Sequence, residues 1–396
     1  MSCKAIARLL CLAWSFGLSV SFFVSDGARA LAAELPAATQ KLLTDAKLPA
    51  SMSVGIDHEL AVPKVWEEGA RREGGVRFSS TFSPTEFRNF IAPFRDRYPF
   101  IKVDYSKATA QQRETSILVA YKEGRYVADV ISSYSGAYKL FVEAQALDDL
   151  RGLPGFLNLG EASRSPQGFW VAYRRQFYCT AYNTNLVQAS ELPQRWEDIL
   201  TNPIWRNGNI GIGNIPQLWL LPLWGTNGES FVRDYIQRFF GVVRPQLRKE
   251  GASALVSLVV AGEFRMSIPA SEYRVQNMVA KGAPVSFHCP DPVPASEPRM
   301  SILRGNPHPN AARLLTNWII SKEGQISLHS STGSPPVHKD LQRGEFVPFP
   351  EVLLGRNYAI RTDDILEEAH PKLLALWNEQ WLKVGGSPGA AGREDD

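Results

Sequence analysis

The chain has 396 residues, of which 44% are hydrophobic and 21% are charged, and its formal net charge at pH 7 is +3. These values are ordinary for a globular protein, and the length suits two domains. The lysines and arginines form no block, which argues against a nucleic-acid-binding protein.

The first 32 residues have the pattern of a secretory signal peptide. Lys4 and Arg8 precede an uncharged, mostly apolar run at 9–24, and small residues suited to cleavage lie between Ala28 and Ala32. The run is short for a membrane span and no later stretch is longer, so we expect a cleaved leader and an exported protein. The alternative is an uncleaved anchor.

Behind the leader, a helical extension is expected at 33–73, and then strands and helices alternate. Ser83, Pro84 and Glu86 form an N-capping pattern, and Pro93 is expected to kink or end the helix that follows. The strands expected here are 76–81, 101–106 and 126–134, and the helices are 84–98, 110–122 and 137–146. This order predicts a mostly parallel sheet with helices on both faces.

The second half of the chain predicts a further α/β lobe. The aromatic stretch 168–183 is typical of a pair of long strands at which the chain crosses over, and the Pro-rich segment 291–298 is expected to be the joint that returns. Between them lie a helix–loop–strand unit at 192–214, helices at 229–240, 252–262 and 272–281, and strands at 264–271 and 284–290. A strand at 299–304, an amphipathic helix at 309–320 and helices at 362–369 and 371–382 follow.

These elements divide the chain into two α/β lobes. We expect the first lobe to be discontinuous, with residues 74–172 and 293–383, and the second lobe to span 173–292. The tail at 384–396 has the composition of a disordered segment.

Two cysteines remain once the leader is removed, Cys179 and Cys289. An even number in an oxidising compartment fits a disulfide, and two buried free thiols are the alternative. Two isolated cysteines without nearby histidine pairs do not make a zinc site, so neither a metal nor a cofactor is expected.

The sequence has no motif of a familiar catalytic class. It contains no G-x-S-x-G, Walker A, G-x-G-x-x-G or H-E-x-x-H pattern, and its six histidines are scattered. A catalytic triad is assembled in space, so the absence of a motif leaves catalysis open. We nevertheless expect a protein that is not an enzyme.

Polar and aromatic residues stand at the ends of four predicted strands. In open α/β sheets, ligands bind outside the carboxyl ends of the strands, where helix N-termini favour anionic groups. The alternative is that Ser83, Ser135 and Ser271 only cap helices. The expected ligand-binding residues are Ser80, Thr81, Phe82, Ser133, Tyr134, Asn214, Trp219, Ser271, Glu272 and Tyr273.

Between about residue 62 and residue 340, a series of stretches follows a familiar order. They are EEGARREGGVRFSSTFS, ADVISS, AYNTNLV, LPQRWEDILTNPIWRNGNIGI, VVAGEFRMSIPAS, VAKGAPVSF and ILRGNPHPNAARLLTNWIISKEGQ. In this order the chain resembles the periplasmic solute-binding proteins of ABC importers, in the type II two-lobed group that includes ferric-iron, thiamine, polyamine and phosphonate binders.

The resemblance implies an α/β, two-lobed periplasmic-binding-protein type II fold, with two mixed sheets flanked by helices and a two-strand hinge. The hinge would be 291–298 and 173–181, and Cys179 and Cys289 would form a disulfide between these crossing segments. The resemblance also implies a periplasmic monomer that captures a small solute between its lobes and delivers it to an inner-membrane permease.

The nature of the solute depends on residues that differ from the ferric-binding pattern. Ferric-binding members place two adjacent tyrosines after the strand matched by FRMSIPAS, where this chain has Glu272 and Tyr273, and often a histidine after the first strand, where it has Thr81 and Phe82. An organic solute is therefore expected rather than ferric iron. Aromatic walls would come from Phe82, Tyr134, Trp219 and Tyr273.

Serine hydroxyls and Arg274 are candidates for holding a carboxylate or phosphonate, although Arg274 also fits an exposed helix position. Two other functions remain open. One is a secreted hydrolase or transferase on a similar two-lobed fold, and the other is a sensory protein that presents its ligand to a membrane receptor.

Overall fold

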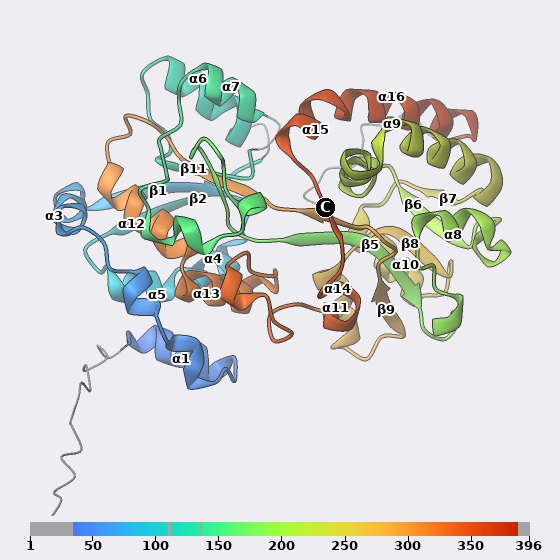
Figure 1. Cartoon of the computed structure of the whole chain (residues 1–396), viewed down its shortest axis with the longest axis horizontal. Coiled ribbons are helices and arrows are strands. Elements are labelled where there is room, and N and C mark those ends of the chain that lie inside the picture. The colour runs from blue at the N-terminus through green and yellow to red at the C-terminus, as the bar shows by residue number, and fades with distance from the viewer. Residues whose placement is uncertain (1–34, 110–111, 135–136, 387–396) are drawn as a thin grey trace, which may run out of the picture. The chain divides into compact units, whose positions relative to one another are not determined.

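The structure, a computed structural model, describes residues 35–109, 112–134 and 137–386. The leader expected at 1–32 and the tail from residue 387 lie outside these residues. The described chain forms two mixed sheets with flanking helices (Figure 1), which confirms the predicted fold class. No helix in the described ranges is long and apolar enough to cross a membrane.

The first sheet has the strand order β2-β1-β3-β11-β4. Its strands are β1 (Gly75–Ser80), β2 (Lys102–Lys107), β3 (Val130–Ser132), β4 (Val171–Ala172) and β11 (Arg299–Ile302). β1 pairs in parallel with β2 and β3, as the βαβαβ order predicts, whereas β11 is antiparallel to β3 and β4. The carboxyl ends of β1 and β3 therefore lie at the same edge.

Helices cover both faces of this sheet. Neighbouring residues of a strand point to opposite faces, so both faces contribute residues to a core. Val130 faces the core that contains Trp318, and Ile131 faces a second core that contains Phe141. The helices of this part are α1 (Ala37–Asp45), α2 (Ile56–Glu59), α3 (Lys64–Glu73), α4 (Pro84–Phe90), α5 (Ala92–Arg97), α6 (Ile117–Lys122), α7 (Tyr138–Glu143), α12 (Pro309–Ile320) and α13 (Lys322–Thr332).

The helix after β1 follows its sequence signals closely. The Ser83 hydroxyl accepts the N–H of Glu86, and the Glu86 carboxylate accepts the N–H of Ser83, which together form the predicted capping box. The predicted break also occurs, because α4 ends at Phe90 and α5 begins at Ala92 with Pro93 in its first turn.

The second sheet has the order β12-β10-β5-β8-β6-β7, with β9 also paired to β5. Its strands are β5 (Gln176–Asn183), β6 (Ile210–Gly213), β7 (Gln246–Arg248), β8 (Met266–Ser271), β9 (Val285–His288), β10 (Val293–Ser296) and β12 (Tyr358–Ile360). Its helices are α8 (Trp196–Thr201), α9 (Leu220–Arg238), α10 (Ala252–Val260), α11 (Glu272–Val279), α14 (Pro350–Leu353), α15 (Asp363–Glu368) and α16 (His370–Lys383).

The sequence predicts that residues 293–383 belong to the first lobe, but in the structure the end of the chain packs on the second lobe. β10 and β12 extend the second sheet, and Trp377 of α16 packs against Trp219 and Phe240 in the second core. The apolar face of α16 showed only that the helix is packed on one side. The aromatic residues of the second lobe provide the surface that it covers.

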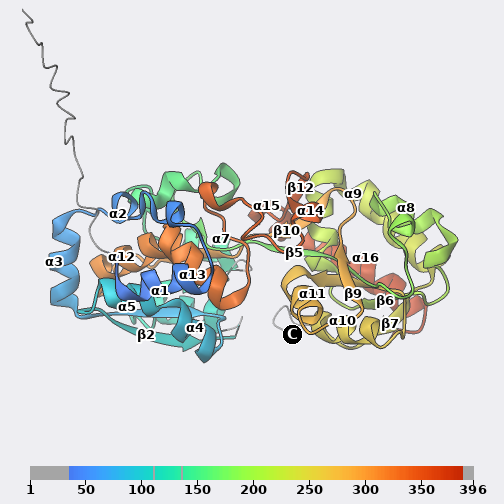
Figure 2. The same ribbon diagram turned by 90° about the horizontal axis from the view of Figure 1, so that it is seen from below.

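The crossings between the sheets are shorter than predicted. The first runs from β4 to β5 through 173–175, and the second runs from β10 to β11 through 297–298. Half of the segment expected as a Pro-rich joint is strand β10 (Val293–Ser296), which pairs with β5 and lies beside it in Figure 2. A third crossing, through 333–349, carries the chain from α13 to α14.

Cys179 on β5 and Cys289 just after β9 form a disulfide, with their Cα atoms 5.1 Å apart. The two strands are antiparallel neighbours, so the bond lies inside the second lobe. It fastens β5, which emerges from the first crossing, to the end of β9.

Candidate functional site

The ends of β1 and β3 bring three serines together at one edge of the first sheet. The hydroxyl oxygens of Ser80 and Ser132 are 2.6 Å apart, and both residues are fully buried. Ser133 turns the chain away from the sheet with a φ of 55°, and its hydroxyl lies 2.7 Å from that of Tyr173. The two strand ends therefore meet the first crossing segment.

Tyr173 is buried beneath this cluster, with 1% of its surface exposed. Burial alone pushes the pKa of the phenol up. The charge of Arg174 and hydrogen bonding with Ser133, Ser132 and Ser80 outweigh that effect, so the pKa of Tyr173 is lowered. The phenol therefore lies in a positive, hydroxyl-rich environment.

Arg174 stands next to this phenol and is only partly exposed. Its Nη2 donates to Thr81 Oγ1 across 3.3 Å, and its guanidinium carbon lies 5.5 Å from the rings of both Phe82 and Tyr173. Its Nε is buried and has no hydrogen-bond partner among the described residues. This guanidinium therefore retains donor capacity that the protein does not use.

A second guanidinium, that of Arg113, hydrogen-bonds to the backbone at the same edge of the sheet. Arg113 is 4% exposed, and it donates through Nε to the Ser133 carbonyl at 3.0 Å and through Nη1 to the Ala108 carbonyl. Neither Arg113 nor Arg174 forms an ion pair with a carboxylate within the described ranges. The site thus carries positive charge without a matching carboxylate.

The second lobe contributes the end of β8. Ser271 pairs with Tyr178 of β5, and Glu272 next to it is fully buried. Glu272 Oε2 accepts the N–H of Phe177 at 2.9 Å, whereas Oε1 has no partner among the described residues. Burial raises the pKa of Glu272 to about 8, although the N–H of Phe177 and the charge of Arg174 act against it. Glu272 is therefore mostly neutral at pH 7.

Tyr273 and Arg274 follow at the start of α11. Tyr273 is partly exposed, and the guanidinium carbon of Arg274 lies 5.0 Å from its ring. Arg274 itself is exposed, which matches the alternative that it is a surface helix residue.

The structure places three of the predicted aromatic walls inside hydrophobic cores, which corrects that expectation. Phe82, Tyr134 and Trp219 are each at most 2% exposed. The Tyr134 hydroxyl is paired with that of Ser301, and Trp219 packs against neighbouring aromatic rings. Each follows a strand end, but its side chain packs into a hydrophobic core, and the tertiary packing decides which core that is.

Asn214, at the end of β6, also has a structural partner. Its Oδ1 accepts the indole N–H of Trp377 at 2.9 Å, so this strand end is tied to the C-terminal helix. The loop after it contributes Ile215 and Leu218, which pack against Tyr178.

Sequence reasoning missed Arg113, Tyr173 and Arg174 as members of the site. The signal that indicates Arg174 is the pair Arg174–Arg175, which interrupts an otherwise aromatic strand pattern. Two adjacent charges in such a run are unusual, because alternate residues of a strand face opposite sides. Arg113 gives no comparable signal.

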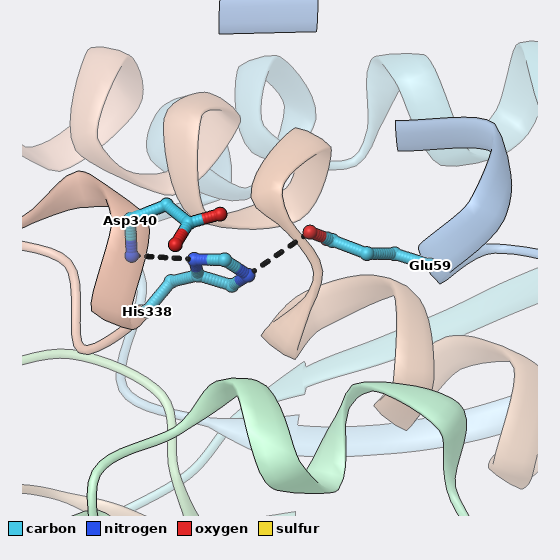
Figure 3. A group of neighbouring side chains, drawn as sticks. All are labelled: Glu59, His338 and Asp340. Carbon is cyan, nitrogen blue, oxygen red and sulfur yellow. Dashed lines mark hydrogen bonds and ion pairs between the residues drawn. The ribbon is translucent and has the colours of Figure 1, made fainter. Parts of the chain in front are cut away.

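A different cluster, Glu59, His338 and Asp340, has the composition of a metal site but is held together internally (Figure 3). His338 Nδ1 accepts the N–H of Asp340, so a neutral ring carries its proton on Nε2, which lies 3.2 Å from Glu59 Oε1. The ammonium of Lys322 lies 3.3 Å from Asp340 Oδ2. The Lys322 ammonium therefore places a positive charge beside these carboxyls, while the buried Nε2 of His338 makes no hydrogen bond among the described residues.

Comparison with known proteins agrees with this architecture. The family model of the bacterial extracellular solute-binding protein matches residues 126–350, more than half of the chain. Iron-bound HitA from Pseudomonas aeruginosa is 18% identical, with a TM-score of 0.61 over 77% of this chain and 99% of that chain.

Two substrate-binding proteins of ABC transporters have the same fold. The protein from Bradyrhizobium japonicum USDA 110 is 17% identical, with a TM-score of 0.62 over 78% of this chain and 99% of its own. The protein from Agrobacterium tumefaciens is 14% identical, with a TM-score of 0.61 over 78% of this chain and 96% of its own. The chain therefore belongs to the bacterial extracellular solute-binding proteins, a non-enzymatic family of transport proteins, and has the fold of ABC transporter substrate-binding proteins.

Proposed function

We propose that this protein is the periplasmic substrate-binding component of an ABC importer. It captures a small solute at the ends of β1, β3 and β8, beside the first crossing segment, and delivers it to a membrane permease. The partner is the permease, and the protein acts as a monomer.

The observation that carries the proposal is the position of Tyr173 and Arg174. They lie on a segment that joins the two sheets, and they contact Ser133 and Thr81 at the strand ends of the first lobe. A solute bound here touches both a lobe and the connection between lobes. Binding can then favour one arrangement of the lobes through its differential contacts, as a hinge mechanism requires.

The hydroxyl groups of the site contact other hydroxyl groups, an arrangement that suits binding a solute. Ser80 and Ser132 face each other, and Ser133 faces Tyr173, so each hydroxyl lies against another hydroxyl rather than against a general base. A serine nucleophile needs a base within hydrogen-bond reach. This arrangement supports binding over hydrolysis.

The charge of the site favours an organic solute over ferric iron. Ferric iron is a hard cation that prefers anionic oxygen ligands. The site instead has the guanidinium groups of Arg113 and Arg174, and its buried carboxyl, Glu272, is mostly neutral.

Ferric iron is the second candidate, and two observations favour it. The fold is similar to that of iron-bound HitA, and the lowered pKa of Tyr173 makes its phenolate, a hard oxygen ligand, more accessible. An iron site on Tyr173 requires this buried phenol to give up its contact with Ser133 or share it.

A thermal-shift screen of ligand-stripped, refolded protein tests the proposal. The panel contains ferric citrate, amino acids, polyamines, thiamine, sugars, small carboxylates and phosphonates. A solute at 100 times its Kd is expected to stabilise the protein by about 2.7 kcal/mol. The hit is then tested with the cognate permease in proteoliposomes, where the loaded protein is expected to stimulate ATP hydrolysis and uptake. Turnover of the hit into product contradicts the proposal.

A further inference from the structure

We infer that the site recognises an oxyanion of its solute, a carboxylate, phosphonate or similar group, and that Arg174 binds it together with the hydroxyls of Thr81 and Ser133. This inference rests on the proposed function and specifies the chemical class of the solute.

The first support is uncompensated charge. An arginine stays charged at any physiological pH, and a buried charge without a counterion is costly. Arg174 lacks a carboxylate partner within the described ranges. Arg113, whose guanidinium lies nearby, donates only to the carbonyls of Ser133 and Ala108 there. An anion at this point would neutralise charge that the protein leaves unpaired.

The nearby acidic groups do not provide the counterion. Glu86 is committed to the capping box of α4, where it accepts the N–H of Ser83. Glu272 is buried, accepts the N–H of Phe177 and is mostly neutral at pH 7. Neither carboxyl forms an ion pair with Arg174 among the described residues, although burial, which lowers the pKa of Arg174, is outweighed by the phenols of Tyr173, Tyr178 and Tyr273 and by Glu86, which raise it.

The second support is the unused donor. Arg174 Nε is buried and without a partner, and Nη2 makes only a 3.3 Å contact with Thr81 Oγ1, which is long for a charge-assisted hydrogen bond. A guanidinium edge with a free Nε and a weakly engaged Nη2 matches the fork geometry that binds two oxygens of one acid group. The Thr81 hydroxyl lies next to this edge, and the Ser133 hydroxyl, now paired with the Tyr173 phenol, lies on the neighbouring strand end.

The test measures the affinity of stripped protein for methylphosphonate, phosphate, sulfate, succinate and citrate, with succinamide as the neutral counterpart of succinate. Arg174→Gln removes the charge, Arg174→Lys keeps the charge without the fork, and Arg233→Gln is the control at an exposed arginine of α9. Circular dichroism and the melting temperature show whether each variant is folded.

We expect at least one oxyanion to bind the wild-type protein, and succinamide not to bind. Arg174→Gln is expected to weaken binding of that oxyanion by about 10- to 100-fold, the range of a charge-assisted hydrogen bond, while Arg233→Gln changes it less than about threefold. Arg174→Lys is expected to fall between wild type and Arg174→Gln. The phosphonate and carboxylate arms decide which acid group the site prefers.

Three results overturn the inference. The first is an oxyanion affinity that Arg174→Gln leaves unchanged in a folded variant. The second is an absence of binding by every oxyanion of the panel, and the third is a preferred ligand that is neutral or cationic. Binding of a neutral solute or of ferric iron leaves the solute-binding function intact and removes only the oxyanion. The function itself fails when the protein converts its ligand.

Discussion

Arg175 and Glu297 form an ion pair, with 2.7 Å between Nη2 and Oε1, that joins the first and second crossing segments. The backbone N–H of Arg175 also donates to the Pro335 carbonyl, and its Nη1 donates to Gln342 Oε1 on the third crossing. One arginine therefore binds all three segments that connect the sheets, next to Arg174, which faces the candidate site.

Replacing Glu297 with Gln is expected to lower the free energy of unfolding by about 3 kcal/mol, because it leaves Arg175 buried without its counterion. Urea denaturation measures the loss. Glu345→Gln removes a partner from the exposed Arg343–Glu345 pair and is the control, with an expected change below about 0.5 kcal/mol. Equal losses in both variants contradict a special role for the Arg175 clasp.

Glu272 is expected to make stability depend on pH. Its pKa is about 8 in the native protein against a usual value of 4.5, so between these values the native state holds a proton that the unfolded state has released. The free energy of unfolding therefore falls as pH rises through this window and levels off above pH 8. The cost of this group at high pH is on the order of a few kcal/mol.

The measurement compares urea denaturation of wild type and Glu272→Gln from pH 5 to pH 9. The variant is expected to gain stability over wild type as pH rises. Glu263→Gln, which changes a carboxyl that is 48% exposed, is expected to follow the wild-type profile. Parallel profiles for wild type and Glu272→Gln contradict the assignment.

The disulfide closes a loop with a sequence separation of 110 residues. In the chain-entropy account, such a bond constrains the unfolded state, and native bonds of this kind contribute about 2–4 kcal/mol. The Cys179→Ala, Cys289→Ala double variant is expected to lose this amount in urea denaturation. Dithiothreitol is expected to destabilise wild type and to leave the double variant unchanged, and equal sensitivity of the two proteins contradicts the bond.

Trp219 is expected to affect stability rather than binding. It is fully buried against Trp196 and Trp377, so Trp219→Phe leaves a cavity in the core and is expected to cost about 1–3 kcal/mol. The affinity for the solute found in the screen is expected to stay within about twofold of wild type. A large loss of affinity at unchanged stability restores Trp219 as a binding residue.

Local signals predicted the elements of this protein well. The capping box at Ser83, the helix break at Pro93 and the helix at Pro309 each depend on residues within a turn or two of one another. The candidate site was predicted only in part. The strand ends with Ser80 and Ser133 do meet, but the direction of Phe82, Tyr134 and Trp219 depends on which core lies beneath each of them.

The sequence by itself determined the alternation of helices and strands, the two-sheet α/β class and the family, because caps, periodicity and the order of motifs act over short distances along the chain. Only the tertiary structure decided that α16 covers the second lobe, that Arg175 contacts all three crossings and that Arg174 lies beside a serine cluster without an ion pair to any carboxylate of the described residues. These relationships join residues such as Arg175 and Glu297, which are far apart in sequence, and packing alone selects which of many apolar or charged partners meet.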